Sequence, residues 1–416
     1  MLAGEKGSQT NALVQAAINK IVRPAYTLSL VSRNRTFATC IVMLGTLASA
    51  ESMQNKVQRM LSGVAAVDQP GVAALVRQNG ETVFEGGHGL RDLRSRSPLD
   101  AHTDFRLASC TKQFTAMAAM LLVHDGRLRY DERLTDIFPE FPAYGTSITV
   151  RNLLNHSSGL PDYEELMEKT GGAQKQRWTE SNQITDAEAL KLLESVRVGR
   201  FAPGTRWAYS NSGYVVLGMI VAKVSGLSFP DFLQQRVFKP LRMDDSIAYV
   251  KGINTVSNRA YGYSVEGSTL VETDQSSTSA TLGDGGIYSN LSDLAKWDDA
   301  LSRHTLLSDA EMRDALTPAR MPGGSLPKWD SGPGDTDPLG GKPVAYGFGW
   351  FLDPYQGHER MWHYGETAGF RSAVQRFPKD RLTVIVLSNR SDVSAIDLAM
   401  RIAALYLNNT NKSPEP

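Results

Sequence analysis

Residues Ser109 to Val123 read SCTKQFTAMAAMLLV, with a serine and a lysine three positions apart at the head of a strongly apolar stretch. The length and composition of the part from Phe114 to Val123 predict a buried helix. Ser109 and Lys112 would share one face of it, one turn apart, so the lysine amine can take the proton of the serine hydroxyl if burial lowers its pKa. Free backbone N–H groups at the helix start favour developing negative charge beside Ser109.

A Ser-x-x-Lys match is weak evidence by itself, because roughly one or two are expected by chance in a chain of this length. A second copy, Ser325-Leu326-Pro327-Lys328, lies in a Gly/Pro-rich run and has a proline between its ends, so we expect it to form a loop. Apolar neighbours predict that Lys112 is buried. The first copy therefore has the right context for a nucleophile, Ser109, and its activating base, Lys112.

Two further motifs follow in order. Tyr209-Ser210-Asn211 comes after the turn signal Pro203-Gly204-Thr205 and before a helical run from Tyr214 to Val224. His363-Tyr364-Gly365 comes later and is followed by Glu366. The chain thus carries Ser-x-x-Lys, Tyr-x-Asn and His-x-Gly in one order.

This ordered set resembles the class C β-lactamase and DD-peptidase family of serine hydrolases, which also holds related esterases and D-amino-acid peptidases. Segments between the motifs resemble the same family: LLNHSSGLP at 153–161, KPLRM at 239–243 and GDGGIYS at 283–289. The resemblance runs from about residue 56 to about residue 408. It implies an α+β fold with an antiparallel sheet, N- and C-terminal helices flanking it, and an inserted, mostly helical subdomain at about 125–280.

The resemblance also implies roles for the second motif. Tyr209 would be a second proton carrier that hands the serine proton to the leaving group. Its phenol has an ordinary pKa near ~10, so it needs a nearby cation such as Lys112 to act as a base at neutral pH. Asn211 would project to the same side if the segment is extended, and it can hydrogen-bond Lys112 and a substrate amide.

In the third motif, His363 takes the position that is lysine in β-lactamases proper. Gly365 would let the strand backbone approach the bound substrate closely. Glu366 falls where the family supplies a second oxyanion-hole N–H, beside that of Ser109, and a backbone donor does not depend on its side chain. A neutral histidine and a negative Glu366 disfavour an anionic ligand, which argues against efficient β-lactamase activity.

Local patterns agree with strands at both ends of the chain and helices between them. Expected strands cover 72–78 and 82–85, joined by a turn at Asn79-Gly80, and later 345–352, 359–363, 372–377 and 383–387. Expected helices include 54–61, 187–195, 214–224 and 394–405. The segment from Glu164 to Gln183 is expected to be a loop or short helix at the rim.

Composition excludes several other classes of protein. The chain of 416 residues has 44 basic and 44 acidic residues and no basic stripe, so we expect no nucleic-acid partner. None of its seven histidines pairs at i, i+4 and no Cys-x-x-Cys occurs, so no metal site is expected. Acyl-enzyme chemistry needs no cofactor. The sequence leaves the oligomeric state open.

The first fifty residues carry an export pattern. Arg33 and Arg35 precede an apolar run, Phe37 to Leu47, which ends in the small residues Ala48-Ser49-Ala50. We therefore expect an extension and signal peptide over 1–50, cleavage near Ala50, a secreted or periplasmic product, and one hydrolase domain over 51–410. A disordered extension or uncleaved anchor is the alternative, and the true translation start stays open.

The expected function is that of a secreted serine hydrolase that forms an acyl-enzyme on esters or small amides. The alternative is a class C-like β-lactamase or a D-alanyl-D-alanine carboxypeptidase of cell-wall metabolism, and a catalytically dead binding protein is a third possibility. Small esters, amides or β-lactams are the expected partners. An α/β-hydrolase is disfavoured, because the chain has no Gly-x-Ser-x-Gly elbow.

Overall fold

The computed structural model describes residues 51–169, 177–330 and 340–410. The expected signal segment and its cleavage site near Ala50 lie outside the described residues.

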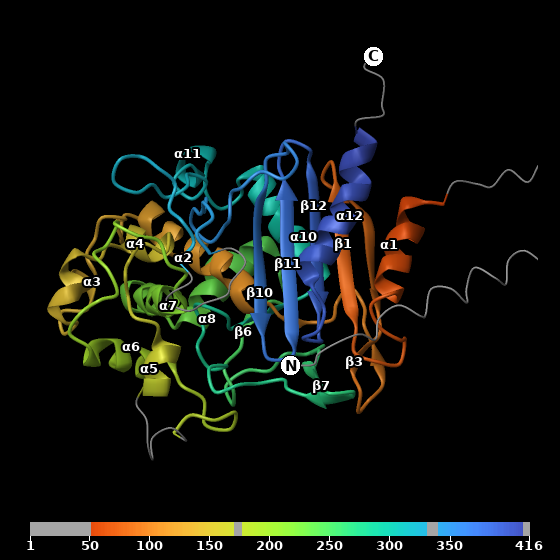
Figure 1. Cartoon of the computed structure of the whole chain (residues 1–416), viewed down its shortest axis with the longest axis horizontal. Helices are drawn as coiled ribbons and strands as arrows, with labels where there is room; N and C mark the ends of the chain where they lie inside the picture. The colour runs from red at the N-terminus through yellow and green to blue at the C-terminus, as the bar shows by residue number, and fades with distance from the viewer. Residues whose placement is uncertain (1–50, 170–176, 331–339, 411–416) are drawn as a thin grey trace, which may run out of the picture. The chain divides into compact units, whose positions relative to one another are not determined.

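A five-stranded antiparallel sheet joins the two ends of the described chain in the order β10-β11-β12-β1-β2 (Figure 1). Its strands are β1 (Val72–Gln78), β2 (Glu81–His88), β10 (Met361–Thr367), β11 (Phe370–Phe377) and β12 (Leu382–Ser388). Asn79 and Gly80 both have positive φ angles, as a tight hairpin turn between β1 and β2 requires. The strands expected at 72–78, 372–377 and 383–387 are confirmed, and the one expected at 359–363 lies slightly later.

Each face of the sheet is covered by helices, because alternate side chains of a strand point to opposite faces. Ala74 and Val76 pack with α1 (Met53–Ser62) and α12 (Ala395–Thr410) in one apolar cluster. Ala73 and Leu75 belong to the other cluster, with α2 (Lys112–His124) and α10 (Leu291–Arg303). The expected terminal helices are thus confirmed.

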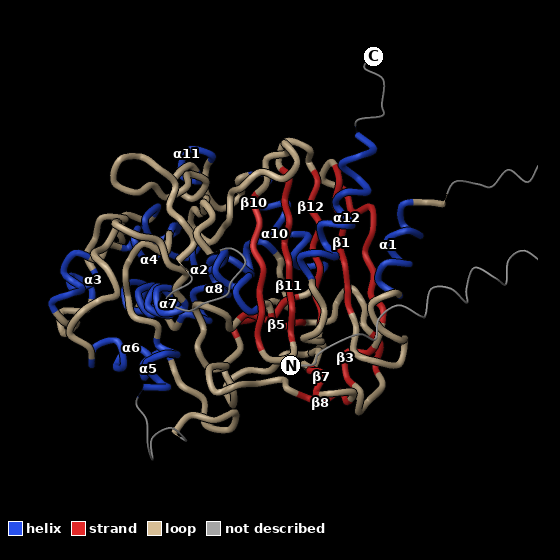
Figure 2. Tube along the Cα trace, in the orientation of Figure 1, coloured by secondary structure: helices blue, strands red, loops and turns tan. Residues whose placement is uncertain are grey.

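Most of the remaining helices lie beyond β10, away from the rest of the sheet (Figure 2). The remaining helices are η1 (Ala108–Thr111), which packs against β10 and β11, α3 (Leu134–Ile137), η2 (Ala143–Ser147), α4 (Val150–Leu154), α5 (Tyr163–Lys169), α6 (Asp186–Ser195), α7 (Asn211–Ser225), α8 (Phe229–Leu233), the π-helical η4 (Gln234–Phe238), α9 (Lys239–Leu241) and α11 (Asp309–Met312). Short strand pairs complete the fold: β3 (Leu90–Asp92) with β4 (Ser97–Pro98), β9 (Ile287–Ser289) with β5 (Phe105–Arg106) and β6 (Ile247–Ala248), and β7 (Tyr263–Glu266) with β8 (Thr269–Glu272). The α+β architecture is the expected one.

No single described helix is long and apolar enough to cross a membrane. One bent pair, Asn211–Ser225 with Phe229–Leu241, meets the length and composition criteria jointly, with a 76° bend between its halves.

The strand expected at 345–352 is wrong. This segment folds back on itself, with Tyr346 bridged to Phe351 and Phe351 bridged to Trp362 of β10. Gly349 has a φ of +76°, and a Cβ there would lie 2.8 Å from the carbonyl oxygen of Lys112. A tight turn against α2 therefore interrupts the segment that was expected to be a strand.

Candidate active site

Ser109 sits in the single turn of 3₁₀ helix η1, which runs directly into α2. It is half-exposed, whereas Ala108 and Cys110 on either side are buried. Ala108 has a φ of +48°, a strained conformation for a residue with a side chain that costs about 1–3 kcal/mol. This turn leaves Ser109 partly exposed just before α2, and its place at the start of the helix is the predicted one.

Lys112 is completely buried, and its ammonium group is held at three points. Its Nζ donates to Ser109 Oγ at 3.2 Å, to Asn211 Oδ1 at 2.9 Å and to the carbonyl oxygen of Asp284 at 3.0 Å. Burial lowers its pKa to about 8, while the charges of Asp284 and Glu164 oppose that shift. A lysine with this pKa beside a serine hydroxyl has the geometry and basicity of a general base.

Tyr209 lies in the loop before α7, with its ring 4.8 Å from Lys112 Nζ. Burial raises the pKa of its phenol well above the ordinary value, and a hydrogen bond with Ser109 offsets part of that shift. The phenol is therefore protonated at neutral pH, so it is prepared to pass on a proton rather than to abstract one unaided.

Asn211 is the first residue of helix α7, and Ser210 caps that helix by accepting from Gly213 N–H. Ser210, between Tyr209 and Asn211, is extended with a φ of −141° and a ψ of 108°, and the helix begins at Asn211. The predicted contact with Lys112 is present. The Asn211 amide nitrogen also donates to Glu164 Oε1 at 3.2 Å, and a contact with a substrate amide stays a prediction.

His363 is fully buried in β10. Its Nε2 lies 3.1 Å from the Tyr346 hydroxyl and its Nδ1 lies 2.7 Å from the carbonyl oxygen of Tyr364, while its ring packs against that of Tyr209 with centroids 6.3 Å apart. Burial lowers its pKa to about 3, so the ring is neutral. The structure thus places the His363 ring against Tyr209, and substrate binding by the His363 side chain stays a prediction.

Gly365 explains how β10 comes so close to the nucleophile. A Cβ at this position would lie 2.1 Å from the carbonyl oxygen of Leu107, 2.5 Å from Ser372 Oγ and 2.9 Å from Ser109 N. The close approach is therefore to the Ser109 turn, a different reason for glycine than the expected approach to substrate. Glu366, next along the strand, is exposed, and its carboxylate lies 3.9 Å from Arg371. β10 is the edge strand, and a Glu366 N–H aimed at an oxyanion stays a prediction.

The sequence did not predict the set of acidic residues near Lys112, which we call the acidic group: Asp162, Glu164 and Asp284. Burial, reinforced by the charges of Asp162 and Asp284, raises the pKa of Glu164 to about 7. Asp284 is buried, and its Oδ2 accepts from the Tyr163 hydroxyl at 3.3 Å. The one signal for Asp284 was an acidic residue inside the Gly-rich segment 283–286. Glu164 gave none, since the pattern there indicates only a polar rim.

This acidic group leads to a pH prediction. We expect kcat/KM to rise with pH through about 8, because only neutral Lys112 accepts a proton. Asp284→Asn should move the rise toward lower pH by roughly one unit, since it removes a charge that favours protonated Lys112. Glu164 titrates in the same range, so the measured rise belongs to a coupled pair.

Asp186→Asn is the matched control for this pH profile. Asp186 binds the loop that carries Asp284, because its carboxylate accepts a hydrogen bond from Leu282 N–H. Burial raises the pKa of Asp186 to about 8, so at pH 7 its replacement removes little charge. An unmoved profile in Asp284→Asn, or an equal shift in the control, would contradict an electrostatic role for Asp284.

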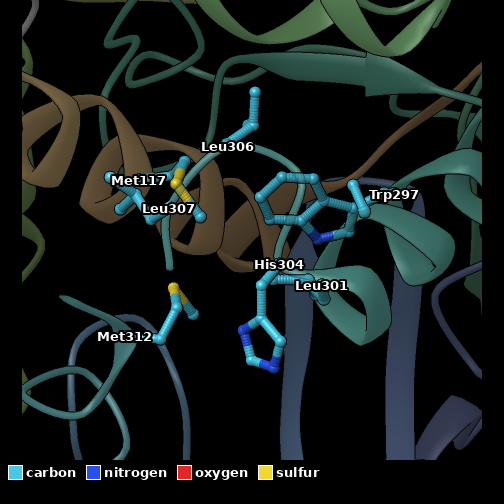
Figure 3. Close-up of a pocket in the computed structure, with 8 residues that line it drawn as sticks. Met117, Trp297, Leu301, His304, Leu306, Leu307 and Met312 are labelled. Carbon is cyan, nitrogen blue, oxygen red and sulfur yellow. The ribbon is translucent and has the colours of Figure 1, made fainter. Parts of the chain in front are cut away.

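A separate apolar pocket lies where α2 meets α10 (Figure 3). Its labelled side chains are Met117, Trp297, Leu301, His304, Leu306, Leu307 and Met312. His304 is its one titratable residue and ends α10 with a φ of +53°. Because the lining carries no nucleophile or carboxylate, this pocket offers no chemistry for acyl transfer. Among the described residues, no group of three His, Cys, Asp or Glu side chains could hold a metal ion.

The chain is similar to known proteins over most of its length. A family model described as Beta-lactamase matches residues 57–407. A penicillin-binding protein of Bacillus subtilis (strain 168) is 29% identical over 85% of this chain and 76% of its own length. A D-aminopeptidase of Cereibacter sphaeroides is 27% identical over 81% of this chain, which spans only 60% of that enzyme.

A similar fold is found among solved structures. The D-amino acid amidase from Ochrobactrum anthropi SV3, complexed with L-phenylalanine amide, superposes with a TM-score of 0.69 and 26% identity. The match covers 87% of this chain and the whole of that one.

Proposed function

The chain belongs to the β-lactamase family of serine hydrolases, and from this we propose that it hydrolyses small amides and esters through an acyl-enzyme on Ser109. The observation that carries the proposal is the contact of 3.2 Å between Lys112 Nζ and Ser109 Oγ, with burial lowering the pKa of that lysine to about 8. This reaction requires a nucleophile and, within hydrogen-bond reach of it, a base whose pKa lies near the working pH.

In the proposed mechanism, neutral Lys112 takes the Ser109 proton as Oγ attacks the substrate carbonyl. Tyr209, hydrogen-bonded to Ser109 and protonated at neutral pH, delivers a proton to the departing nitrogen or oxygen. The C–N or C–O bond breaks and leaves an ester on Ser109. Lys112 then passes its proton to the Tyr209 phenolate and is neutral again. Water, deprotonated by Lys112, attacks the ester and releases the acid, and the Ser109 oxygen takes that proton back from Lys112.

The oxyanion of each tetrahedral intermediate would be held by the backbone N–H groups of Ser109 and Glu366. Ser109 lies at the start of α2, where the helix dipole adds favourable positive potential. The tight packing of Gly365 against the Ser109 turn keeps the two donors in one fixed arrangement. Donors that are ordered before reaction stabilise charge without a reorganisation cost.

Charge favours an acyl group that carries an ammonium. Asp162, Glu164 and Asp284 all act on Lys112 electrostatically, so three carboxyl groups lie within electrostatic range of one cation next to Ser109. A substrate ammonium would balance this excess, whereas a carboxylate there would be repelled. The relatives named as D-aminopeptidase and D-amino acid amidase act on substrates of that kind by name, so we propose amino-acid amides and esters, of the D series, as substrates.

We also propose that the protein is exported. The support is the basic, apolar and small-residue pattern at 33–50, with cleavage near Ala50. N-terminal sequencing of protein recovered outside the cytoplasm tests this, and a start at residue 51 is the expected result. An N-terminus upstream of the apolar run would overturn it.

Covalent labelling tests the proposed function. A fluorophosphonate probe is expected to modify Ser109, located by peptide mapping, and Ser109→Ala protein should stay unlabelled. In parallel, D-alaninamide, p-nitrophenyl acetate and nitrocefin are compared as substrates. Amide and ester turnover with little nitrocefin hydrolysis supports the proposal. Nitrocefin turnover far above the other two would favour a β-lactamase, and no label on Ser109 would favour a binding protein.

A further inference from the structure

An aromatic surface lies beside Tyr209. The ring of Trp329 is nearly parallel to that of Tyr209, with an interplanar angle of 18° and centroids 6.4 Å apart. Trp207 packs against Trp329 with centroids 5.1 Å apart and is itself buried. Trp329 and Tyr209 are only partly buried. The residue proposed to protonate the leaving group is therefore bordered by an accessible indole.

Trp329 also forms part of a pocket of about 340 Å³. Its apolar lining includes Trp207, Met321, Leu326 and Trp329, and its charged lining is Arg206, Lys328 and Asp330. Leu326 and Lys328 belong to the second Ser-x-x-Lys copy, which forms a loop as the sequence predicts. That copy is no nucleophile, yet its residues supply one wall of a pocket that adjoins Tyr209.

The charge of this pocket is opposite to that of the group around Glu164. Arg206 pairs with Asp330 at 2.5 Å, while Lys328 adds a further exposed cation. On the strand beside the nucleophile, His363 is neutral and buried, so it offers no charge to a carboxylate. The carboxyl group beside Asn211 and the rim of this pocket thus differ in charge, acidic at Glu164 and cationic at Lys328.

We propose that this pocket is the leaving-group subsite and that it binds an amino acid with an apolar side chain and a free carboxylate. Trp329 would contact the side chain, and Lys328 would attract the carboxylate. This inference rests on the proposed function, and it narrows the substrate from any small amide to a dipeptide whose ammonium faces Glu164.

The reaction on such a dipeptide balances in the proposed mechanism. Ser109 Oγ bonds to the carbonyl carbon, the peptide C–N bond breaks, and the nitrogen takes the proton that Tyr209 delivers. The second amino acid leaves from the Trp329 pocket as a neutral amine that protonates in water. Hydrolysis of the ester on Ser109 then releases the first amino acid.

Two ratios of kcat/KM test the subsite in the full-length protein. The first compares D-alanyl-phenylalanine, in both configurations of the phenylalanine, with D-alanyl-glycine. The second compares D-alanyl-phenylalanine with its C-terminal amide. Both ratios are expected to exceed one in the wild type. Because the two substrates in each ratio share the D-alanyl acyl group, a general loss of catalysis lowers kcat/KM for both and leaves the ratio unchanged.

The variants address the two contacts separately. Trp329→Ala should lower the first ratio by roughly tenfold through lost apolar contact, and Trp329→Phe should retain most of it. Lys328→Met should lower the second ratio severalfold and spare the first. Lys342→Met is the control, since this exposed lysine lies on a neighbouring segment and does not line the pocket.

Each outcome has one meaning. Wild-type ratios at or below one, or ratios unchanged in Trp329→Ala and Lys328→Met, overturn the subsite. If dipeptides are not cleaved while D-alaninamide is turned over and Ser109 is labelled, the subsite is wrong and the proposed function stands. If Ser109 is not labelled, the proposed function itself fails.

Discussion

Replacing Ser109 with alanine is expected to lower kcat by roughly 10⁴-fold or more, and Lys112→Met should come close to the same loss. The two side chains share one hydrogen bond and act as one unit. Without the serine there is no acyl-enzyme, and without the lysine the hydroxyl keeps its proton. The double variant should therefore be no worse than the poorer single one, which is far from additive.

Steady-state kinetics on D-alaninamide and p-nitrophenyl acetate measures this, with thermal unfolding to establish that each variant is folded. Cys110→Ala is the matched control, because Cys110 is next to the nucleophile but buried, with burial raising the pKa of its thiol to about 12. It should keep activity within severalfold. Additive losses in the double variant would mean that Lys112 does not act through Ser109.

The second large effect is expected for Gly365→Ala. The new methyl group would lie 2.1 Å from the Leu107 carbonyl oxygen and 2.9 Å from Ser109 N. Both contacts are with backbone, so β10 or the Ser109 turn must move. We expect a loss in kcat of roughly 10²–10³-fold, the size seen when an oxyanion-hole donor is removed. Overpacking should also lower the stability by about 1–3 kcal/mol.

Activity and melting temperature measured on the same preparation separate these two effects. Gly63→Ala serves for comparison, because its Cβ would meet neighbours only at 3.5 Å and its φ of −80° suits alanine. A Gly365→Ala protein with a lower melting temperature and normal kcat would show that catalysis does not need this close approach.

Much of the fold could be predicted from local patterns. The apolar run at 72–76 and the Asn79-Gly80 turn predicted β1, and uniform apolarity predicted α2, since each element buries its own residues. The strand expected at 345–352 is absent because of a contact between segments that are distant in the sequence. Its residues are apolar enough for a strand, but the close packing of Gly349 against Lys112 forces a turn that no local pattern contains.

The contacts of the candidate site were likewise only partly predictable from the sequence. Ser109 and Lys112 share one helical turn, so their spacing alone predicted their contact of 3.2 Å. The contact of Asn211 with Lys112 bridges 99 positions, and only the motif resemblance indicated it. Glu164 and Trp329 belong to no motif, and nothing in their local sequence showed that they would lie beside Asn211 and Tyr209.

The sequence by itself predicted Ser109 as the nucleophile, Lys112 as its base and the α+β class, because these predictions rest on spacing within one helix, on periodicity within single elements and on the ordered motifs. The tertiary structure alone decided the charge and shape around Ser109. Long-range folding gathers carboxyl groups at Lys112, buries His363 in its neutral form and stacks Trp329 on Tyr209. Burial and electrostatic fields depend on what surrounds a group in space, and a residue's neighbours along the chain do not specify that.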